Sequence, residues 1–330
     1  MSTTQPVESA RLHHALRHDH TNHPRHHTHR TNTHTQVERA SAPCSPCQDA
    51  VVTDPLILPA SDSWTTPSGS SEPGLRVHVS LPTTPTSQPV SVLVLLDGDF
   101  MFLTATEFAR TLGLVSLGDF PPVAVVGVMR DEPNPLAYIT SRFRDFTPDE
   151  WTLPGPFAAD NAMASKGTGG APEFLRLLVD VVLPQVRARM NAAGHAMGEC
   201  AIGGWSLSGL FAAWAWLEHS DVFPRAMAIT PSLWWNDASI LSRDIGKRPA
   251  SHRLFVCAGE HEEGDVSKVY PQRFANADQR VMAAMVRNAE TFGQRATESG
   301  ASVDFAIYAG EHHVTVQSSA IARGMLHLFG

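Results

Sequence analysis

Six residues in the second half of the chain have the pattern that places a serine where it can act as a nucleophile. Residues 204–209 read GWSLSG, follow the apolar run 200–202, and precede the apolar, helix-like segment 210–217. In a nucleophile elbow, a sharp turn from strand to helix lifts a serine hydroxyl above the sheet, and its neighbours are small because the backbones nearly touch. Gly204 and Ser206 fit the usual G-x-S-x-G pattern, whereas Ser208 occupies the place of the second glycine. Ser206 is therefore the candidate nucleophile, and an ordinary Gly-Ser turn is the alternative.

Candidates for the two partners that a nucleophilic serine needs follow later in the chain. A serine hydroxyl needs a base to take its proton, and the base needs a third group to orient it. The acidic segment 259–263 (GEHEE) and the adjacent pair His312 and His313 supply both types. Serine, acid, histidine is the chain order of the α/β hydrolases. Each side chain taken alone is equally a solvated surface residue, so the prediction depends on the combination.

Alternating strands and helices position these groups. We expect strands at 76–81, 90–96, 123–128, 200–202, 226–229, 254–258 and 302–308, and helices at 104–112, 172–190, 210–217, 275–299 and 319–328. The alternation predicts an α/β fold with a mostly parallel central sheet and helices on both faces. The segment 61–72 is rich in Ser, Thr, Pro and Gly and is expected to be a loop. Ligands of such sheets bind beyond the carboxyl ends of the strands, which is where the polar segments fall.

Composition excludes several classes of function. The chain has 330 residues and a net charge of −8, which argues against a nucleic-acid partner. It has no run of about 18 apolar residues, so no membrane span is expected, and no apolar leader typical of secretion. Cys200 and Cys257 lie in apolar runs and are interpreted as buried thiols. These features predict a cytoplasmic protein without a disulfide framework.

The first 50 residues differ from the rest. They hold nine of the 17 histidines, together with Cys44 and Cys47 in a C-x-x-C arrangement. Such tracts bind zinc, nickel or copper in some proteins, but the irregular spacing here matches no zinc finger, and a start site assigned too early is a further explanation. With few apolar residues to offset the entropy of ordering, we expect a disordered His-rich tail at 1–50, a linker at 51–74, and one catalytic domain at 75–330. No metal or cofactor is expected.

The motifs together resemble one family. The chain is similar to the putative-esterase family of α/β hydrolases, and closest to its enterochelin (ferric siderophore) esterase branch, over about residues 75–330. The similarity rests on DGD at 97–99, RFRDFTP at 142–148, GWSLSG at 204–209, SLWW at 232–235, GEHE at 259–262 and GEHH at 310–313. The resemblance implies Ser206 as nucleophile, His313 as base and Glu262 as acid. Some members of the branch work with serine and histidine alone, so a neighbouring glutamate or no acid remains an alternative to Glu262.

Further site residues follow from this assignment. Backbone N–H groups should form the oxyanion hole: that of Leu207, directly after the nucleophile, and that of Gly98 or Asp99, after the strand 90–96. Arg142, Trp205, Trp234 and Trp235 are expected to bind a planar, anionic substrate such as a catecholate. Core packing is the equal alternative for the three tryptophans.

Three functions remain in competition. The first is a serine esterase that acts through an acyl-enzyme on a small-molecule ester, such as a catecholate siderophore or a related hydroxy-aryl ester. The second is a feruloyl or acetyl carbohydrate esterase, or an acyltransferase, on the same scaffold. The third is a non-catalytic metal- or ligand-binding protein with an inactive elbow, supported by Ser208 at the glycine position.

Overall fold

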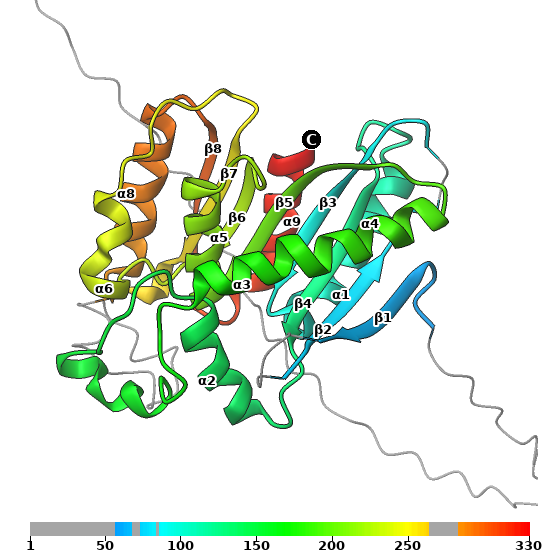
Figure 1. Cartoon of the computed structure of the whole chain (residues 1–330). Coiled ribbons are helices and arrows are strands. Elements are labelled where there is room, and N and C mark those ends of the chain that lie inside the picture. Colours follow the sequence, from blue (N-terminus) through cyan, green and yellow to red (C-terminus); the bar gives the residue numbers. More distant parts are fainter. Residues whose placement is uncertain (1–56, 68–72, 84–85, 264–282) are drawn as a thin grey trace, which may run out of the picture. The chain divides into compact units, whose positions relative to one another are not determined.

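The computed structural model describes residues 57–67, 73–83, 86–263 and 283–330 (Figure 1). The expected tail at 1–50, with its histidines and its C-x-x-C, lies outside these residues. So does the first part of the helix expected at 275–299.

Within the described residues, eight strands form one sheet in the order β1-β2-β4-β3-β5-β6-β7-β8. Their bounds are β1 Ser61–Thr66, β2 Leu75–Ser80, β3 Val90–Leu96, β4 Val123–Arg130, β5 Met197–Trp205, β6 Arg225–Ile229, β7 Arg253–Gly259 and β8 Ser302–Tyr308. β1 and β2 pair antiparallel with each other, and β2 pairs antiparallel with β4. All other pairs are parallel. The mostly parallel sheet is as predicted, and the carboxyl ends of six parallel strands share one edge.

The prediction of a loop at 61–72 is wrong for Ser61–Thr66, because these residues form β1 at the edge of the sheet. Its sequence, SDSWTT, lacks an apolar run because an edge strand with one solvated face needs few apolar side chains. Trp64 packs on the core, and Thr66 is buried. The strand also falls within the segment 51–74 that was expected to be a linker.

The helices cover both faces of the sheet (Figure 1). Their bounds are α1 Gly98–Val115, α2 Pro135–Asp145, α3 Ala171–Leu177, α4 Leu183–Ala192, α5 Leu207–Glu218, α6 Trp235–Ala238, α8 Met285–Glu298 and α9 Val316–Phe329. Short 3-10 helices lie at Gly155–Ala162 (η1), Ser239–Ser242 (η3) and Glu260–Glu262 (η4). The single helix expected at 172–190 is interrupted by a π-helical segment, Leu178–Val182. Pro184 follows it and has no N–H to continue the α-helical bonding.

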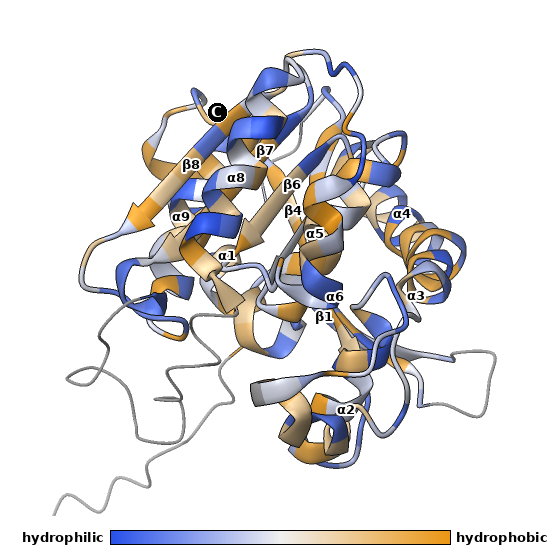
Figure 2. Ribbon diagram, turned by 90° about the vertical axis from the view of Figure 1, so that its left-hand side faces the viewer, coloured by the Kyte–Doolittle hydropathy of each residue, from blue (hydrophilic) through white to orange (hydrophobic). Residues whose placement is uncertain are grey.

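Two apolar layers hold the helices on the sheet. The side chains of β3 alternate, so Val92 and Val94 join the layer beneath α3, α5 and α8, whereas Leu93 and Leu95 join the layer beneath α1 and α9. In Figure 2, α8, which packs on β7 and β8, carries hydrophilic turns in blue on the side that faces the viewer. Because the side chains of β3 are buried on both faces of the sheet, its sequence is an unbroken apolar run. No helix that the structure describes is long and apolar enough to cross a membrane.

Candidate active site

Ser206 occupies a strained turn between β5 and α5. Its backbone has φ 63° and ψ −118°, a conformation that costs a non-glycine residue free energy and that clusters at functional sites. Three backbone hydrogen bonds hold it there: its N–H donates to Ile229, and its carbonyl accepts from Ser232 and Leu210, at 2.9–3.0 Å. The conformation and its position agree with the predicted nucleophile elbow.

The small residues of the motif have different tasks. A Cβ on Gly204 would lie 2.2 Å from the carbonyl oxygen of Ser208, so the close approach of β5 and α5 requires glycine at that position. Ser208, where the usual motif has glycine, is fully buried. Its hydroxyl accepts the backbone N–H of Trp205 at 2.7 Å. The departure from the usual motif therefore adds a hydrogen bond within the elbow.

His313 and Glu262 lie side by side at the same edge of the sheet. Nδ1 of His313 is 2.7 Å from Oε2 of Glu262, while Oε1 of Glu262 accepts the backbone N–H of Gly259 at 2.7 Å. Glu262 is only 4 % exposed, whereas the His313 side chain is 27 % exposed. A buried carboxylate beside Nδ1 of a partly exposed imidazole holds a proton on that nitrogen and so fixes the tautomer.

The neighbouring glutamates have other partners. Glu260 accepts the backbone N–H of Gly310 at 2.7 Å. Glu263 accepts two hydrogen bonds from Arg287, one from its backbone N–H and one from its guanidinium, each at 3.1 Å. Of the three acidic residues in the segment 259–263, only Glu262 is placed against His313.

Trp205 connects the elbow to the histidine loop. The indole N–H of Trp205 donates to the backbone carbonyl of His313 at 2.6 Å, and the two rings lie 5.0 Å apart. His313 is thus held against the residue that precedes Ser206. The adjacent His312 turns its Nδ1 toward the backbone N–H of Val314, at 3.2 Å.

Ser232 is a site residue that the sequence analysis did not identify. Its hydroxyl lies 3.4 Å from that of Ser206 and is buried. Ser232 lies three residues after the end of β6. Between them, Thr230 has a φ of 38°, which turns the chain toward the elbow. The sequence signal for it is the serine of SLWW at 232–235, which closely follows the apolar run 226–229.

Arg142 was expected to bind substrate, and in the structure its guanidinium pairs with a buried carboxylate. Its Nε and Nη2 donate to the two carboxylate oxygens of Asp97, each at 2.8 Å, and Nη2 also lies 3.2 Å from the Trp205 carbonyl. Its side chain is 12 % exposed. Burial alone would lower the pKa of Arg142, but the charge of Asp97, together with its hydrogen bonds, raises that pKa above its ordinary value. An arginine committed to a buried carboxylate favours a supporting role behind the elbow over a substrate contact.

The two adjacent tryptophans differ. Trp235 is 1 % exposed and donates its indole N–H to the Asp149 carbonyl at 3.1 Å, so its expected role in substrate binding is wrong and the core alternative holds. Trp234 is half-buried and stacks on Phe157 of η1, with ring centres 4.3 Å apart and planes 5° apart. Trp151 packs edge-on against Trp235. Of the expected aromatic contacts, Trp205 and Trp234 keep part of their surface exposed.

The expected oxyanion donors lie at two helix starts. Leu207 is the first residue of α5, and Gly98 and Asp99 are the first two of α1. The first N–H groups of a helix have no partner within it. The side chain of Asp99 binds Arg76 at 2.7 Å and His78 at 2.8 Å, so only its backbone is relevant to this prediction.

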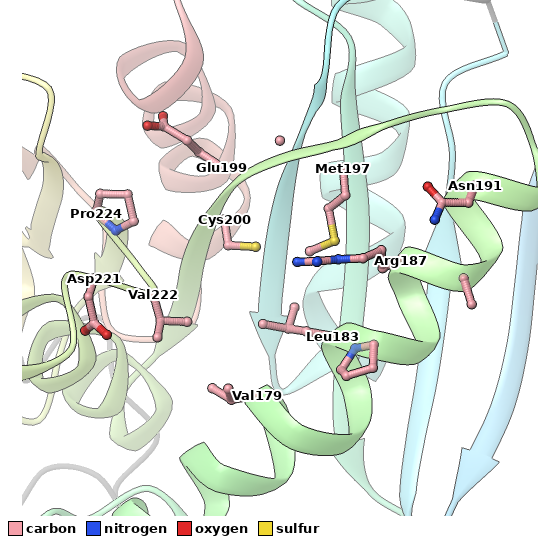
Figure 3. A pocket seen from close by; sticks show the side chains of 13 residues that line it. Val179, Leu183, Arg187, Asn191, Met197, Glu199, Cys200, Asp221, Val222 and Pro224 are labelled. Carbon is pink, nitrogen blue, oxygen red and sulfur yellow. The ribbon is translucent and has the colours of Figure 1, made fainter.

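A separate cavity of about 750 Å³ opens near the other end of β5, beside α4 (Figure 3). Its walls include Leu183, Met197 and Cys200. Cys200 precedes Ser206 by six residues of strand, roughly 20 Å. Burial raises the pKa of the Cys200 thiol to about 11, so the thiol stays protonated and is a poor nucleophile at neutral pH. Among the residues that the structure describes, no group of three or more His, Cys, Asp or Glu side chains is arranged to hold a metal ion.

Comparison with known proteins gives one consistent result. The siderophore enterobactin esterase of Emericella nidulans is 26 % identical over 283 residues, which are 79 % of this chain and 91 % of that protein. The siderophore triacetylfusarinine C esterase of Aspergillus fumigatus is 28 % identical over 300 residues, covering 83 % and 95 %. Among solved structures, the siderophore hydrolase EstA from Aspergillus nidulans superimposes with a TM-score of 0.69 at 23 % identity, over 84 % of this chain and 97 % of EstA.

The predicted fold and family are therefore confirmed. The family described as "Putative esterase" matches residues 68–316, well over half of the sequence. The eight-stranded, mostly parallel sheet with helices on both faces is the one shared with the solved siderophore hydrolase. The chain belongs to the "Putative esterase" family of α/β hydrolases.

Proposed function

We propose that this protein is a serine esterase that hydrolyses ester bonds of a siderophore, with Ser206 as nucleophile, His313 as base and Glu262 as the group that orients the base. The observation that carries the proposal is the 2.7 Å contact between His313 Nδ1 and Glu262 Oε2. The ring of that histidine packs on Trp205, the residue before the strained Ser206. A base that is both oriented and held beside the elbow fits acyl transfer.

The reaction would proceed in two halves. Ser206 Oγ attacks the ester carbonyl carbon as Nε2 of His313 takes the hydroxyl proton. The tetrahedral intermediate then collapses, and the same nitrogen returns the proton to the leaving alkoxide, which departs as an alcohol. Water attacks the resulting acyl-enzyme with His313 again as base, which releases the carboxylic acid and restores the serine. Glu262 stabilises the imidazolium that forms in each half.

The negative charge of the intermediate needs donors fixed in advance. The backbone N–H of Leu207 and that of Gly98 or Asp99 are the proposed pair, because each belongs to the unpaired first turn of a helix beside the elbow. The partial positive charge of a helix N-terminus adds to their effect.

The relatives supply the substrate class. Two curated relatives that cover most of this chain are esterases of enterobactin and of triacetylfusarinine C. Trp234 lies on the segment after β6, two residues from Ser232, and stacks on Phe157 of η1. Planar aromatic surface of this kind suits a hydroxy-aryl group of a catecholate siderophore.

Labelling with a fluorophosphonate tests the nucleophile. We expect the wild-type protein to be labelled, and mass spectrometry to place the adduct on Ser206. Ser206→Ala should lose labelling and, on the order of 10⁶-fold, turnover, while Ser232→Ala, which removes the neighbouring hydroxyl, remains labelled. An adduct on Ser232, or a Ser206→Ala variant with a tenth of wild-type turnover, would exclude Ser206 as the nucleophile.

A substrate panel tests the class. The ferric complexes of enterobactin, bacillibactin and triacetylfusarinine C should be hydrolysed with a higher kcat/KM than feruloyl arabinose and acetylated xylan. Higher activity on the carbohydrate esters would favour the carbohydrate esterase. Transfer of the acyl group to an added alcohol in preference to water would favour the acyltransferase.

A further inference from the structure

A single buried carboxylate joins the two turns that carry the proposed oxyanion donors. Asp97 follows β3 and precedes α1, with φ 55° and ψ 42°, and is fully buried. Its Oδ2 accepts the hydroxyl of Ser208 at 2.6 Å and Nη2 of Arg142 at 2.8 Å. Its Oδ1 accepts Nε of Arg142 at 2.8 Å and the hydroxyl of Tyr138. Four donors satisfy the acceptor capacity of one carboxylate.

These donors link Asp97 to both sides of the nucleophile. Ser208 follows Ser206 by two residues and also accepts the backbone N–H of Trp205, the residue before it. Arg142 reaches from α2 and lies 3.2 Å from the carbonyl of the same Trp205. The elbow is therefore attached to Asp97 through a residue that follows Ser206 and through the residue that precedes it.

The other turn is fixed as well. Asp97 is followed directly by Gly98, where a Cβ would lie 2.5 Å from the backbone nitrogen of Val128. The first turn of α1 thus rests on the backbone of β4 and cannot shift toward it. Burial and the charge of Asp97 raise the pKa of Tyr138, so the phenol keeps its proton and stays a donor in this network.

We propose that Asp97 is a positioning residue that fixes the separation between the Leu207 N–H and the N–H of Gly98 or Asp99, with Ser208 as its link to the elbow. The inference rests on the proposed function, because it assigns those N–H groups to the oxyanion. It also gives a reason for serine at position 208: the hydroxyl that a glycine lacks connects α5 to the turn after β3. Charge-assisted hydrogen bonds are shorter and stronger than neutral ones, which suits a link that must resist movement.

Ser208→Gly is the decisive variant, since it restores the usual G-x-S-x-G pattern. If position 208 only requires a small residue, kcat should be unchanged. If the hydroxyl positions the donors, kcat should fall by about 10- to 100-fold with KM nearly constant, because a misplacement near 1 Å can cost on the order of 10² in rate. Ser208→Ala, which adds no backbone freedom, should give the same result. p-Nitrophenyl acetate serves as substrate.

A transition-state analogue separates positioning from a general loss of stability. A trifluoromethyl ketone forms an adduct with the serine that carries the oxyanion, so its Ki should rise by the same factor as kcat falls. Ser299→Ala is the matched control: Ser299 directly follows α8, and its buried hydroxyl donates to the Ala296 carbonyl in the last turn of that helix at 2.6 Å. The control should lower the melting temperature similarly and leave kcat and Ki unchanged.

A double variant tests whether Ser208 acts through Asp97. Asp97→Asn keeps the shape of the side chain but replaces one acceptor oxygen with a donor. If the two residues form one link, adding Ser208→Ala to Asp97→Asn should reduce kcat by far less than it does alone. Should Asp97→Asn fail to fold, Arg142→Lys, which keeps a charge but loses the two-point contact with Asp97, takes its place in the cycle.

The outcomes are distinct. A Ser208→Gly variant with wild-type kcat and wild-type Ki overturns the positioning role alone. Independent, additive losses in the double variant also overturn it. A wild-type protein that neither hydrolyses esters nor reacts with a fluorophosphonate overturns the proposed function, and this inference with it.

Discussion

Trp205 donates its indole N–H to the backbone carbonyl of His313 at 2.6 Å, across 108 positions of sequence. The residue before the candidate nucleophile thereby holds the loop that carries the candidate base. The ring of Trp205 also lies 5.0 Å from the ring of His313, so both the backbone and the side chain of the histidine are fixed by the elbow. This contact depends on tertiary structure and follows from no local motif.

Trp205→Phe should separate the hydrogen bond from the ring contact. The phenyl ring keeps most of the packing but has no N–H, so the histidine loop gains freedom. We expect kcat to fall by about tenfold, since a net hydrogen bond is worth roughly 1 kcal/mol and positioning errors reduce rate. Trp214→Phe is the control, because its indole is buried and donates to Glu218 within α5 at 2.9 Å. Equal kcat values for the two variants would show that the 2.6 Å contact does not position the base.

The two adjacent histidines should differ sharply. Among the described residues, His313 has Nδ1 against the buried carboxylate of Glu262, whereas Nδ1 of His312 accepts the backbone N–H of Val314. His313→Ala should therefore be nearly as inactive as Ser206→Ala, and His312→Ala should keep most of its turnover. Steady-state hydrolysis of an aryl ester with circular dichroism of both variants checks this. The opposite ranking would reject His313 as base and the register that GEHH at 310–313 implies.

Glu262→Gln tests the orienting acid. Glutamine preserves the acceptor for the Gly259 N–H but no longer stabilises an imidazolium, so kcat should drop by at least about tenfold, yet less than the roughly 10⁶-fold loss for Ser206→Ala. Glu260→Gln is the matched control, since that carboxylate binds the Gly310 N–H. Comparable losses of kcat in both variants would indicate that activity depends only on the conformation of the segment 259–263. The contact between Glu262 and His313 would then have no specific role.

The sheet edge that carries the candidate site was predictable, because the position of its residues follows from chain order. Ser206, Glu262 and His313 each follow an apolar run, and parallel strands bring their carboxyl ends to one edge. The pairing of Asp97 with Arg142 was not predictable, since 45 residues separate them and an arginine near a site pairs equally well with substrate. Burial of that pair is a property of how α2 packs behind the elbow.

The burial of Trp234 and Trp235 was likewise not predictable from the sequence, although the two residues are adjacent. Trp234 and Trp235 are neighbours of identical chemistry, and the turn that follows them decides which one is buried. Asn236 and Asp237 adopt left-handed conformations there, which the sequence SLWWND does not specify. The strand β1 was missed because six mostly polar residues become a strand only once β2 is present to pair with them.

The different burial of these tryptophans gives a substrate test. Trp234→Leu removes a partly exposed aromatic ring, so kcat/KM for a catecholate siderophore should fall by about 2- to 10-fold, through KM, as expected for losing one aromatic contact of roughly 0.5–1.5 kcal/mol. Hydrolysis of p-nitrophenyl acetate by the same variant should change little. Trp235→Leu should instead lower the melting temperature by several degrees, because it empties a buried site. A uniform effect of Trp234→Leu on both esters would argue against its contact with the siderophore.

His327 on α9 should reduce the stability of the folded protein as the pH falls. Burial lowers the pKa of His327, whose Nε2 lies 3.1 Å from the carbonyl of Ser302 and donates to it in the neutral form. As the pH falls below about 6.5, the unfolded chain binds a proton at this residue before the folded protein does. The unfolded state then carries more protons, so the free energy of unfolding decreases as the pH falls toward the lowered pKa. His327→Gln removes this titration, and urea unfolding should show a shallower loss of stability between about pH 7 and pH 5.5 than in the wild type.

The internal control is the same comparison at about pH 8, where His327 is neutral in both the folded and the unfolded chain. The difference in unfolding free energy between variant and wild type at that pH reports only the hydrogen bond. Parallel pH profiles for the two proteins would show that His327 titrates alike in the folded and unfolded chains.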